Sequence, residues 1–188
     1  MTARTGLTYA DFVALPDDGN RYEILDGELF VTPSPAPRHQ IILANLVGIL
    51  SPYVRHRDLG IILFAPLDVI FADTSIAEPD LIYLDNDRMS LMSQRAIEGP
   101  PTLVVEVLSP STERTDRGRK FSVYARFGVG FYWIIDPAER VLEAYRRDGA
   151  AFVLAMRASG SDVCGPPPFE DLNLVMDALW RDVPANEG

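Results

Sequence analysis

The chain has 188 residues, of which 47% are hydrophobic and 23% are charged. This composition is typical of a globular protein, and the length is enough for one core, so we expect one domain over residues 8–180. The formal net charge of −10 argues against tight non-specific binding to nucleic acid, which basic side chains drive. It does not exclude a nucleic-acid enzyme, because a site that clusters carboxylates around a cation is itself acidic.

The single cysteine, Cys164, excludes an intrachain disulfide, and we expect it to be a small packed or surface residue. No apolar run approaches the roughly 18 residues that a membrane span needs. The first residues contain no apolar core of signal-peptide length. We therefore expect a soluble, cytoplasmic protein without a membrane partner.

The N-terminal part of the chain predicts a short helix, a hairpin and a long helix. A capping box at residues 8–11 begins the short helix. Residues 21–31 indicate two short strands around an Asp-Gly dipeptide, which favours a tight turn. Three prolines make residues 32–37 irregular. Apolar residues at helical spacing over residues 38–51 predict an amphipathic helix, which Pro52 would kink or end.

Strands and helices alternate through the rest of the chain, which predicts a mixed α/β fold. Strands are predicted over residues 61–65 and 67–71 (or one strand interrupted by Pro66), 77–84, 102–108, 130–135, 140–145 and 151–156. Helices are predicted over residues 87–98, from a cap at residues 109–112 to about residue 127, and over residues 172–180. The strand at residues 102–108 is apolar almost throughout, as a strand buried on both faces should be.

Two acidic residues lie where acids are costly. Glu106 interrupts the apolar run at residues 102–108, where a carboxylate must be paired, hydrogen-bonded, bound to a cation or protonated. Asp80 follows Pro79 at the mouth of another strand. If the two strands are neighbours, both carboxylates converge at one edge of the sheet, where a hard divalent cation such as Mg²⁺ could bind. The alternatives are a buried structural pair for Glu106 and a turn or cap for Asp80.

Lys120 is the only lysine in the chain, and the other 16 of its 17 basic residues are arginine. Because arginine does not deprotonate in proteins, a lone lysine marks a position where an amine is needed, unless it is a chance survivor. It lies on the predicted helix after the Glu106 strand, whose early turns can lean over the strand end. The alternative is a surface ion pair with Asp116, one turn earlier, worth roughly 0.2–0.5 kcal/mol.

An acid, then a buried acid, then a lysine on the next helix form a pattern that resembles a known family. The motifs that carry the resemblance are residues 22–29, His39, Pro79-Asp80, residues 104–112, Asp116, Lys120, Tyr124, residues 128–129 and residues 132–137. They resemble the Uma-type restriction endonuclease family, within the restriction-endonuclease-like PD-(D/E)XK superfamily, over about residues 8–174. The superfamily pattern places its lysine at position 108, where this chain has Leu108, and relatives of this type supply it from the following helix.

The resemblance implies a restriction-endonuclease-like mixed β-sheet flanked by helices, with an added N-terminal helix and hairpin. It implies Mg²⁺ or Mn²⁺ held by Asp80, Glu106, the carbonyl of Val107 and, from the hairpin, Glu23. It also implies that Lys120 orients or helps to deprotonate the attacking water, or stabilises the transition state. Glu23 is alternatively a charge of the hairpin surface.

We therefore expect a metal-dependent endonuclease that hydrolyses DNA, with Asp80, Glu106 and Lys120 as catalytic residues. The alternatives are a hydrolase of another phosphodiester and a catalytically silent nuclease-fold module for binding or assembly. The net charge favours the silent module, whereas the intact acid–acid–lysine set disfavours it. The strand at residues 130–135 is interpreted as core or as a homodimer contact, and a two-fold dimer would address both DNA strands. His39 is interpreted as a hydrogen-bond partner at a helix start, with a catalytic residue as the alternative.

Overall fold

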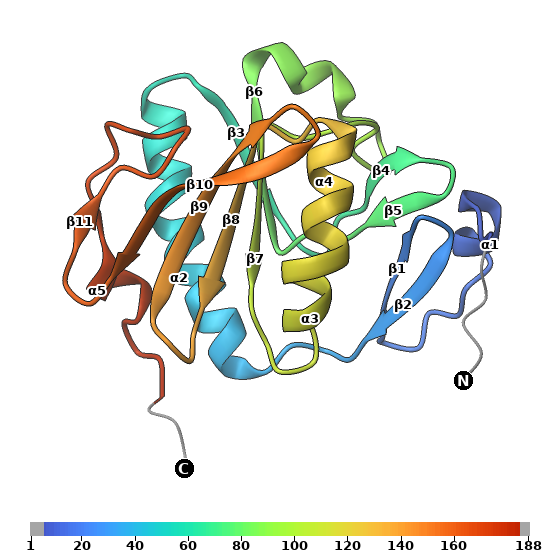
Figure 1. Cartoon of the computed structure of the whole chain (residues 1–188), viewed down its shortest axis with the longest axis horizontal. Coiled ribbons are helices and arrows are strands. Elements are labelled where there is room, and N and C mark those ends of the chain that lie inside the picture. Colours follow the sequence, from blue (N-terminus) through green and yellow to red (C-terminus); the bar gives the residue numbers. More distant parts are fainter. Residues whose placement is uncertain (1–5, 185–188) are drawn as a thin grey trace.

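The computed structural model describes residues 6–184, and its central feature is a six-stranded mixed sheet with helices on both faces (Figure 1). The strand order is β10-β9-β8-β7-β6-β3. Strands β7 and β8 run parallel, and each other neighbouring pair is antiparallel. The strands are β3 (Gly60–Phe64), β6 (Leu81–Asp85), β7 (Leu103–Val107), β8 (Phe131–Asp136), β9 (Val141–Asp148) and β10 (Ala151–Ser159).

A four-stranded antiparallel sheet in the order β2-β1-β5-β4 carries the N-terminal hairpin. Its strands are β1 (Arg21–Leu25), β2 (Glu28–Thr32), β4 (Val69–Ala72) and β5 (Ser75–Ala77), with helix α1 (Tyr9–Val13) beside the hairpin (Figure 1). The predicted N-terminal helix and hairpin are therefore confirmed. Strands β11 (Val163–Cys164) and β12 (Leu174–Val175) form a separate pair, in which Cys164 is a partly buried free thiol.

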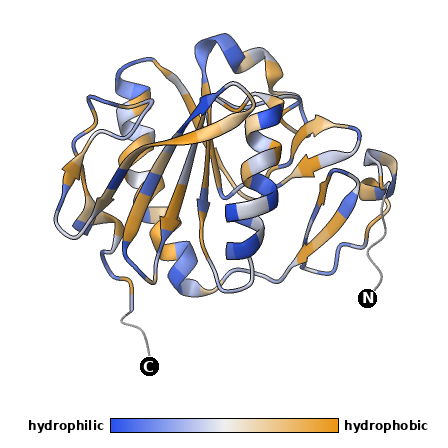
Figure 2. Cartoon of the chain, in the orientation of Figure 1, coloured by the Kyte–Doolittle hydropathy of each residue, from blue (hydrophilic) through white to orange (hydrophobic). Residues whose placement is uncertain are grey.

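Strand β7 contributes side chains to two cores, because successive residues of a strand point to opposite faces of the sheet. Leu103, Val105 and Val107 pack under helix α2 (Pro37–His56), whereas Val104 packs under helix α4 (Phe121–Phe127). Figure 2 shows the hydrophobic residues of the central strands between these helices. The same alternation turns Glu106 toward α4.

Helix α2 is longer than predicted. It begins with Pro37, which suits a first helical position, and it continues through Pro52 to His56. Leu50 and Val54, on either side of that proline, are both buried in the core. Their burial explains why the proline neither ends the helix nor separates its last turn from the protein.

The other predicted helices are partly correct. The prediction of a helix over residues 87–98 is wrong beyond Leu91, because the 3₁₀ helix η1 (Asn86–Leu91) ends there and buried Ile97 bridges to β4. The helix that ends at Phe127 consists of α3 (Glu113–Thr115), the π-helical turn η2 (Asp116–Lys120) and α4. The C-terminal helix is only α5 (Met176–Leu179). None of the helices within residues 6–184 has both the length and the apolar character to cross a bilayer.

Truncating the α2 core should destabilise the fold. Leu46 has no exposed surface, so Leu46→Ala should lower the free energy of unfolding by about 2–5 kcal/mol in urea titrations. Val153, 41% exposed on β10, provides the control, and Val153→Ala should change it by about 0.5 kcal/mol. Equal losses in both variants would contradict this description of the core.

Candidate functional site

Glu106 is buried in the middle of the molecule, with 1% of its surface exposed. Its Oε1 accepts hydrogen bonds from Lys120 Nζ at 3.0 Å and from the Tyr124 hydroxyl at 2.8 Å. Both donors come from the helix that covers this face of the sheet. The costly buried acid that the sequence indicated is therefore hydrogen-bonded, and one of its partners is the lone lysine.

Lys120 is buried among three carboxylates. Its Nζ lies 3.0 Å from Glu23 Oε1, 3.0 Å from Glu106 Oε1 and 3.3 Å from Asp116 Oδ1. The alternative of a surface pair with Asp116 is wrong, because the two residues are 2% and 1% exposed. The π-helical turn η2 contains both of them, and π-turns of this kind are frequent at functional sites.

Asp80 lies between β5 and β6 and joins the site to the end of β7. Its Oδ1 accepts from Arg21 Nη1 at 3.0 Å, and its Oδ2 lies 2.9 Å from His39 Nε2 and accepts from Val107 N at 2.8 Å. Because β6 and β7 are antiparallel neighbours, Asp80 and Glu106 converge at one edge of the sheet, as predicted. His39, near the start of α2, forms the hydrogen bond that was expected of it.

The Asp80 and Glu106 carboxylates line a common cavity of about 240 Å³, together with Arg21, His39 and Lys120. Two loops form its other walls, residues 32–36 between β2 and α2 and residues 109–112 after β7. The cavity is therefore lined both by acidic and basic side chains and by proline, serine and threonine residues.

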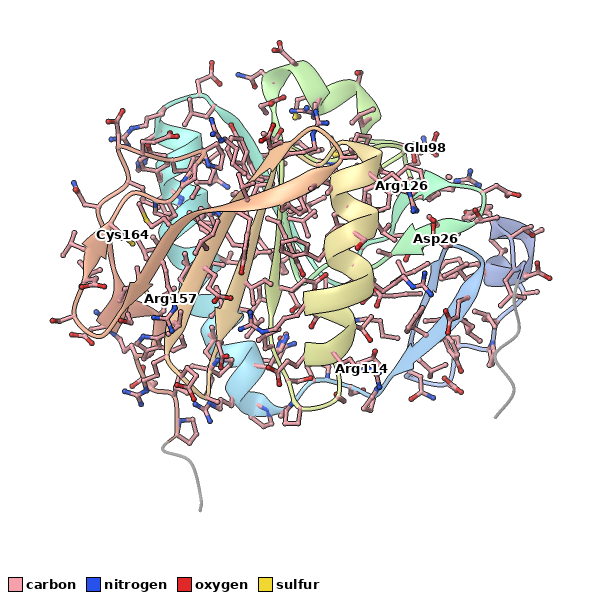
Figure 3. All side chains as sticks on the ribbon, viewed as in Figure 1. Asp26, Glu98, Arg114, Arg126, Arg157 and Cys164 are labelled. Carbon is pink, nitrogen blue, oxygen red and sulfur yellow. The ribbon has the colours of Figure 1, made fainter. Side chains whose placement is uncertain are left out.

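Ion pairs fasten the hairpin that supplies Arg21 and Glu23 to the site. Arg126 of α4 pairs with Asp26 at the hairpin turn (Figure 3). Arg119 Nη2 lies 2.7 Å from Glu28 Oε2 on β2. These exposed pairs contribute little energy individually, but they hold β1 against the helix that carries Lys120.

The site gives its acidic groups very different pKa values. Burial raises the pKa of Glu106 well above its ordinary value, although the charge of Lys120 opposes this. Burial also raises the pKa of Asp116. Burial would raise the pKa of Asp80 too, but the hydrogen bond and charge of His39, together with the charge of Arg21, lower it to about 2. Asp80 is therefore the firmly ionised acid of the cavity.

Lys120 keeps its proton in this environment. Burial would lower the pKa of its ammonium group, but the negative charges of Glu106, Glu23 and Asp116 outweigh burial and raise the pKa well above its ordinary value. A lysine held in this state can donate hydrogen bonds and supply positive charge, whereas it is a poor proton acceptor.

The chemistry of the donor set fits a divalent cation with few protein ligands. Four buried acids, Glu23, Asp80, Glu106 and Asp116, lie beside the basic groups of Lys120, Arg21 and His39. Mg²⁺ is commonly held by one or two carboxylates and keeps several waters, which suits the two that line the cavity. Within residues 6–184, however, no three His, Cys, Asp or Glu side chains are arranged to hold a metal ion.

The other two expected metal ligands have different contacts. Glu23 contacts Lys120 and accepts from the amide of Glu78 at 2.9 Å. The amide of Val107 donates to Asp80. Whether Glu23 and the Val107 carbonyl bind a metal ion stays a prediction.

Sequence reasoning did not single out Arg21 as a site residue. Arg21 precedes Glu23 by two positions on β1, so both side chains point to the same face of the strand. The alternation of β1, taken together with Glu23, is the sequence signal that indicates Arg21. Tyr124 belongs to a motif of the sequence, but its hydrogen bond to Glu106 depends on helix packing that residue spacing alone does not predict.

The chain belongs to the Uma2 family. The sequence model of that family, described as "Putative restriction endonuclease", matches residues 9–177. A solved structure of a putative nuclease of the DUF820 family, from Anabaena variabilis, has a TM-score of 0.77 and 22% sequence identity, over 93% of this chain and 98% of that one. This likeness shows that the two chains share a fold. The uncharacterized protein slr1290 of Synechocystis is 28% identical over 145 residues, which cover 74% of each chain.

Removing the buried ammonium should destabilise the protein in a pH-dependent way. Lys120→Met leaves three buried carboxylates without their cation and should cost about 3–5 kcal/mol at neutral pH. The charge of Lys120 opposes the raised pKa values of Glu106 and Asp116, so its removal raises them further, and the folded variant takes up protons at a higher pH than either the folded parent or the unfolded chain. The deficit should therefore shrink as the pH falls from neutral toward the ordinary carboxyl range.

Urea titrations across that pH range measure this effect. Arg119→Met is the matched control, because Arg119 adjoins Lys120 but is 42% exposed, and its loss should cost less than about 1 kcal/mol. A deficit in Lys120→Met that does not change with pH would show that uncompensated carboxylates are not its cause.

Proposed function

We propose that the protein is a divalent-metal-dependent endonuclease that hydrolyses DNA phosphodiester bonds in the cavity above Asp80 and Glu106. The observation that carries the proposal is the convergence of these two buried carboxylates on one cavity, with a buried lysine hydrogen-bonded to one of them. Membership of a family described as "Putative restriction endonuclease" supports a nucleic-acid substrate. The proposed metal ion is Mg²⁺ or Mn²⁺.

The acids would provide the cation site. Asp80 and Glu106 would hold the ion, with the Val107 carbonyl and Glu23 as further candidates. The bound ion would lower the pKa of a water molecule and neutralise charge on the phosphate. Asp80 is suited to this because it stays ionised, and Glu106 because a nearby positive charge would offset the cost of burying its carboxylate.

The cations of the cavity would act on the phosphate and the attacking water. Lys120 retains its proton, so its role is to orient the water by hydrogen bonding or to stabilise negative charge in the transition state, rather than to accept a proton. Arg21 is a second cation in the cavity lining and stays charged, so it is available to the phosphate oxygens. His39 holds Asp80 in position through its Nε2 atom.

Cleavage of DNA tests the proposal. Purified protein should cleave plasmid or short DNA with Mg²⁺ or Mn²⁺, and a chelator should stop the reaction. Asp80→Asn, Glu106→Gln and Lys120→Ala should each reduce the rate about 100-fold or more, since each removes a group beside the reacting phosphate. Glu98→Gln is the control, because Glu98 is an exposed acid paired with Arg95 outside the cavity. No cleavage by the unmodified protein, or equal cleavage by the variants, would reject the proposal.

A catalytically silent module that binds or assembles is the second candidate. The observation in its favour is that protein donors already bond both Asp80 oxygens and one Glu106 oxygen. Titration calorimetry with Mn²⁺ distinguishes the two. A functional site should give a heat of binding, of either sign, that Glu106→Gln abolishes and Glu98→Gln preserves, whereas a silent site should give no heat that depends on Glu106.

A further inference from the structure

A second, larger cavity adjoins the one that contains the buried acids. It has a volume of about 470 Å³ and lies between the start of α2, the loop after β7 and the β8–β9 turn. The two cavities share the wall residues Ala36, His39, Ser109 and Pro110. The guanidinium of Arg38 donates to the carbonyl of Pro137, which joins α2 to the turn on the far side.

The lining of the second cavity combines apolar side chains with carboxylates. The apolar side chains are Leu108, Pro110, Pro137 and Ala138, and the acids are Glu113, Asp136 and Glu139. Asp136 is held in place, since its Oδ1 accepts from the amides of Ala138 and Glu139 at 2.9 and 3.1 Å. Arg117 pairs with Glu113 and Asp136, and Arg38 donates to the Pro137 carbonyl. The cations at this cavity are therefore already engaged, and the lining is not favourable for a phosphate. A neutral, flat group with amino donors can pack against the apolar side chains of the lining and donate hydrogen bonds to its carboxylates.

The first cavity restricts how a phosphate can reach the acids. Asp80 and Glu106 are 2% and 1% exposed and lie below the loops of residues 32–36 and 109–112. In a duplex, the bases beside a phosphate are stacked and paired inside the helix, so they cannot enter a neighbouring pocket unless they are unstacked. The net charge of −10 also disfavours the many phosphate contacts by which proteins hold a duplex.

We propose that the site takes an unpaired nucleotide, with its phosphate above Asp80 and Glu106 and its adjacent base in the cavity lined by Leu108, Pro110 and Ala138. This inference rests on the proposed function for the position of the phosphate. It identifies the substrate class as single-stranded DNA or an unpaired segment, and it assigns the base-binding role to the second cavity. The shared wall residues Ala36, His39, Ser109 and Pro110 place the two subsites side by side.

Binding by fluorescence anisotropy tests this inference without requiring cleavage. The full chain carries Glu106→Gln, which removes a negative charge beneath the phosphate and prevents the proposed reaction. The probes are a short labelled single strand, the matching duplex, and a strand of equal length whose sugars carry no bases. The single strand should bind at least about tenfold more tightly than either of the others, a difference of about 1.4 kcal/mol. Unmodified protein in chelator gives the same comparison if Glu106→Gln does not fold.

Two matched variants, each with one alanine replaced by tryptophan, test whether the base occupies the second cavity. Ala138→Trp fills the mouth of the second cavity and should weaken single-strand binding about tenfold. Ala150→Trp adds the same side chain to the exposed β9–β10 turn, at the other end of β9, and should leave binding unchanged. Circular dichroism confirms that each variant is folded.

Four results would overturn the inference: equal binding of duplex, equal binding of the base-free strand, no effect of Ala138→Trp relative to Ala150→Trp, and no binding of any strand. Failure of the proposed hydrolysis is a separate result. If the protein binds the single strand selectively but never cleaves DNA, the inferred nucleotide site stands and only the proposed hydrolysis is rejected.

Discussion

The buried ammonium of Lys120 and the three carboxylates around it are the interaction on which the rest of the site depends. Taking a charge out of water costs several kcal/mol, and the cost is recovered only when partners lie within hydrogen-bonding distance. Here Glu23, Glu106 and Asp116 lie 3.0–3.3 Å from one nitrogen. Because the acids outnumber the cations, the cluster holds Lys120 in its charged form and leaves negative charge that a metal ion can neutralise.

The fold supplies the members of this cluster from separate elements. The alternation of β7 turns Glu106 toward the covering helix, and the π-helical turn η2 contains both Asp116 and Lys120. Strand β1 of the smaller sheet brings Glu23 and Arg21, while Asp80 directly precedes β6. Both sheets must therefore be in place before the site exists, which couples the stability of the hairpin to the function of the central sheet.

Much of this could be predicted from sequence because the signals are local. An acid within an apolar strand, a lone lysine among arginines and an Asp-Gly turn each follow from the chemistry of neighbouring residues. The helix over residues 87–98 was wrong because Ile97 is held by β4, a contact that local spacing does not reveal. Other features depend on how distant elements pack. They are the burial of Asp116, the contact of Arg21 with Asp80 and the ion pair of Glu23 with Lys120. The sequence therefore indicated Asp80, Glu106 and Lys120, whereas the surrounding charges needed the structure.

The proposed cation site lies between Asp80 and Glu106, beside this cluster. Manganese is located by its anomalous scattering, so a crystal soaked in Mn²⁺ shows whether an ion binds there. We predict an anomalous peak in the cavity between the carboxylates of Asp80 and Glu106. A well-ordered crystal with no peak there, or with manganese bound only at other carboxylates, would contradict it.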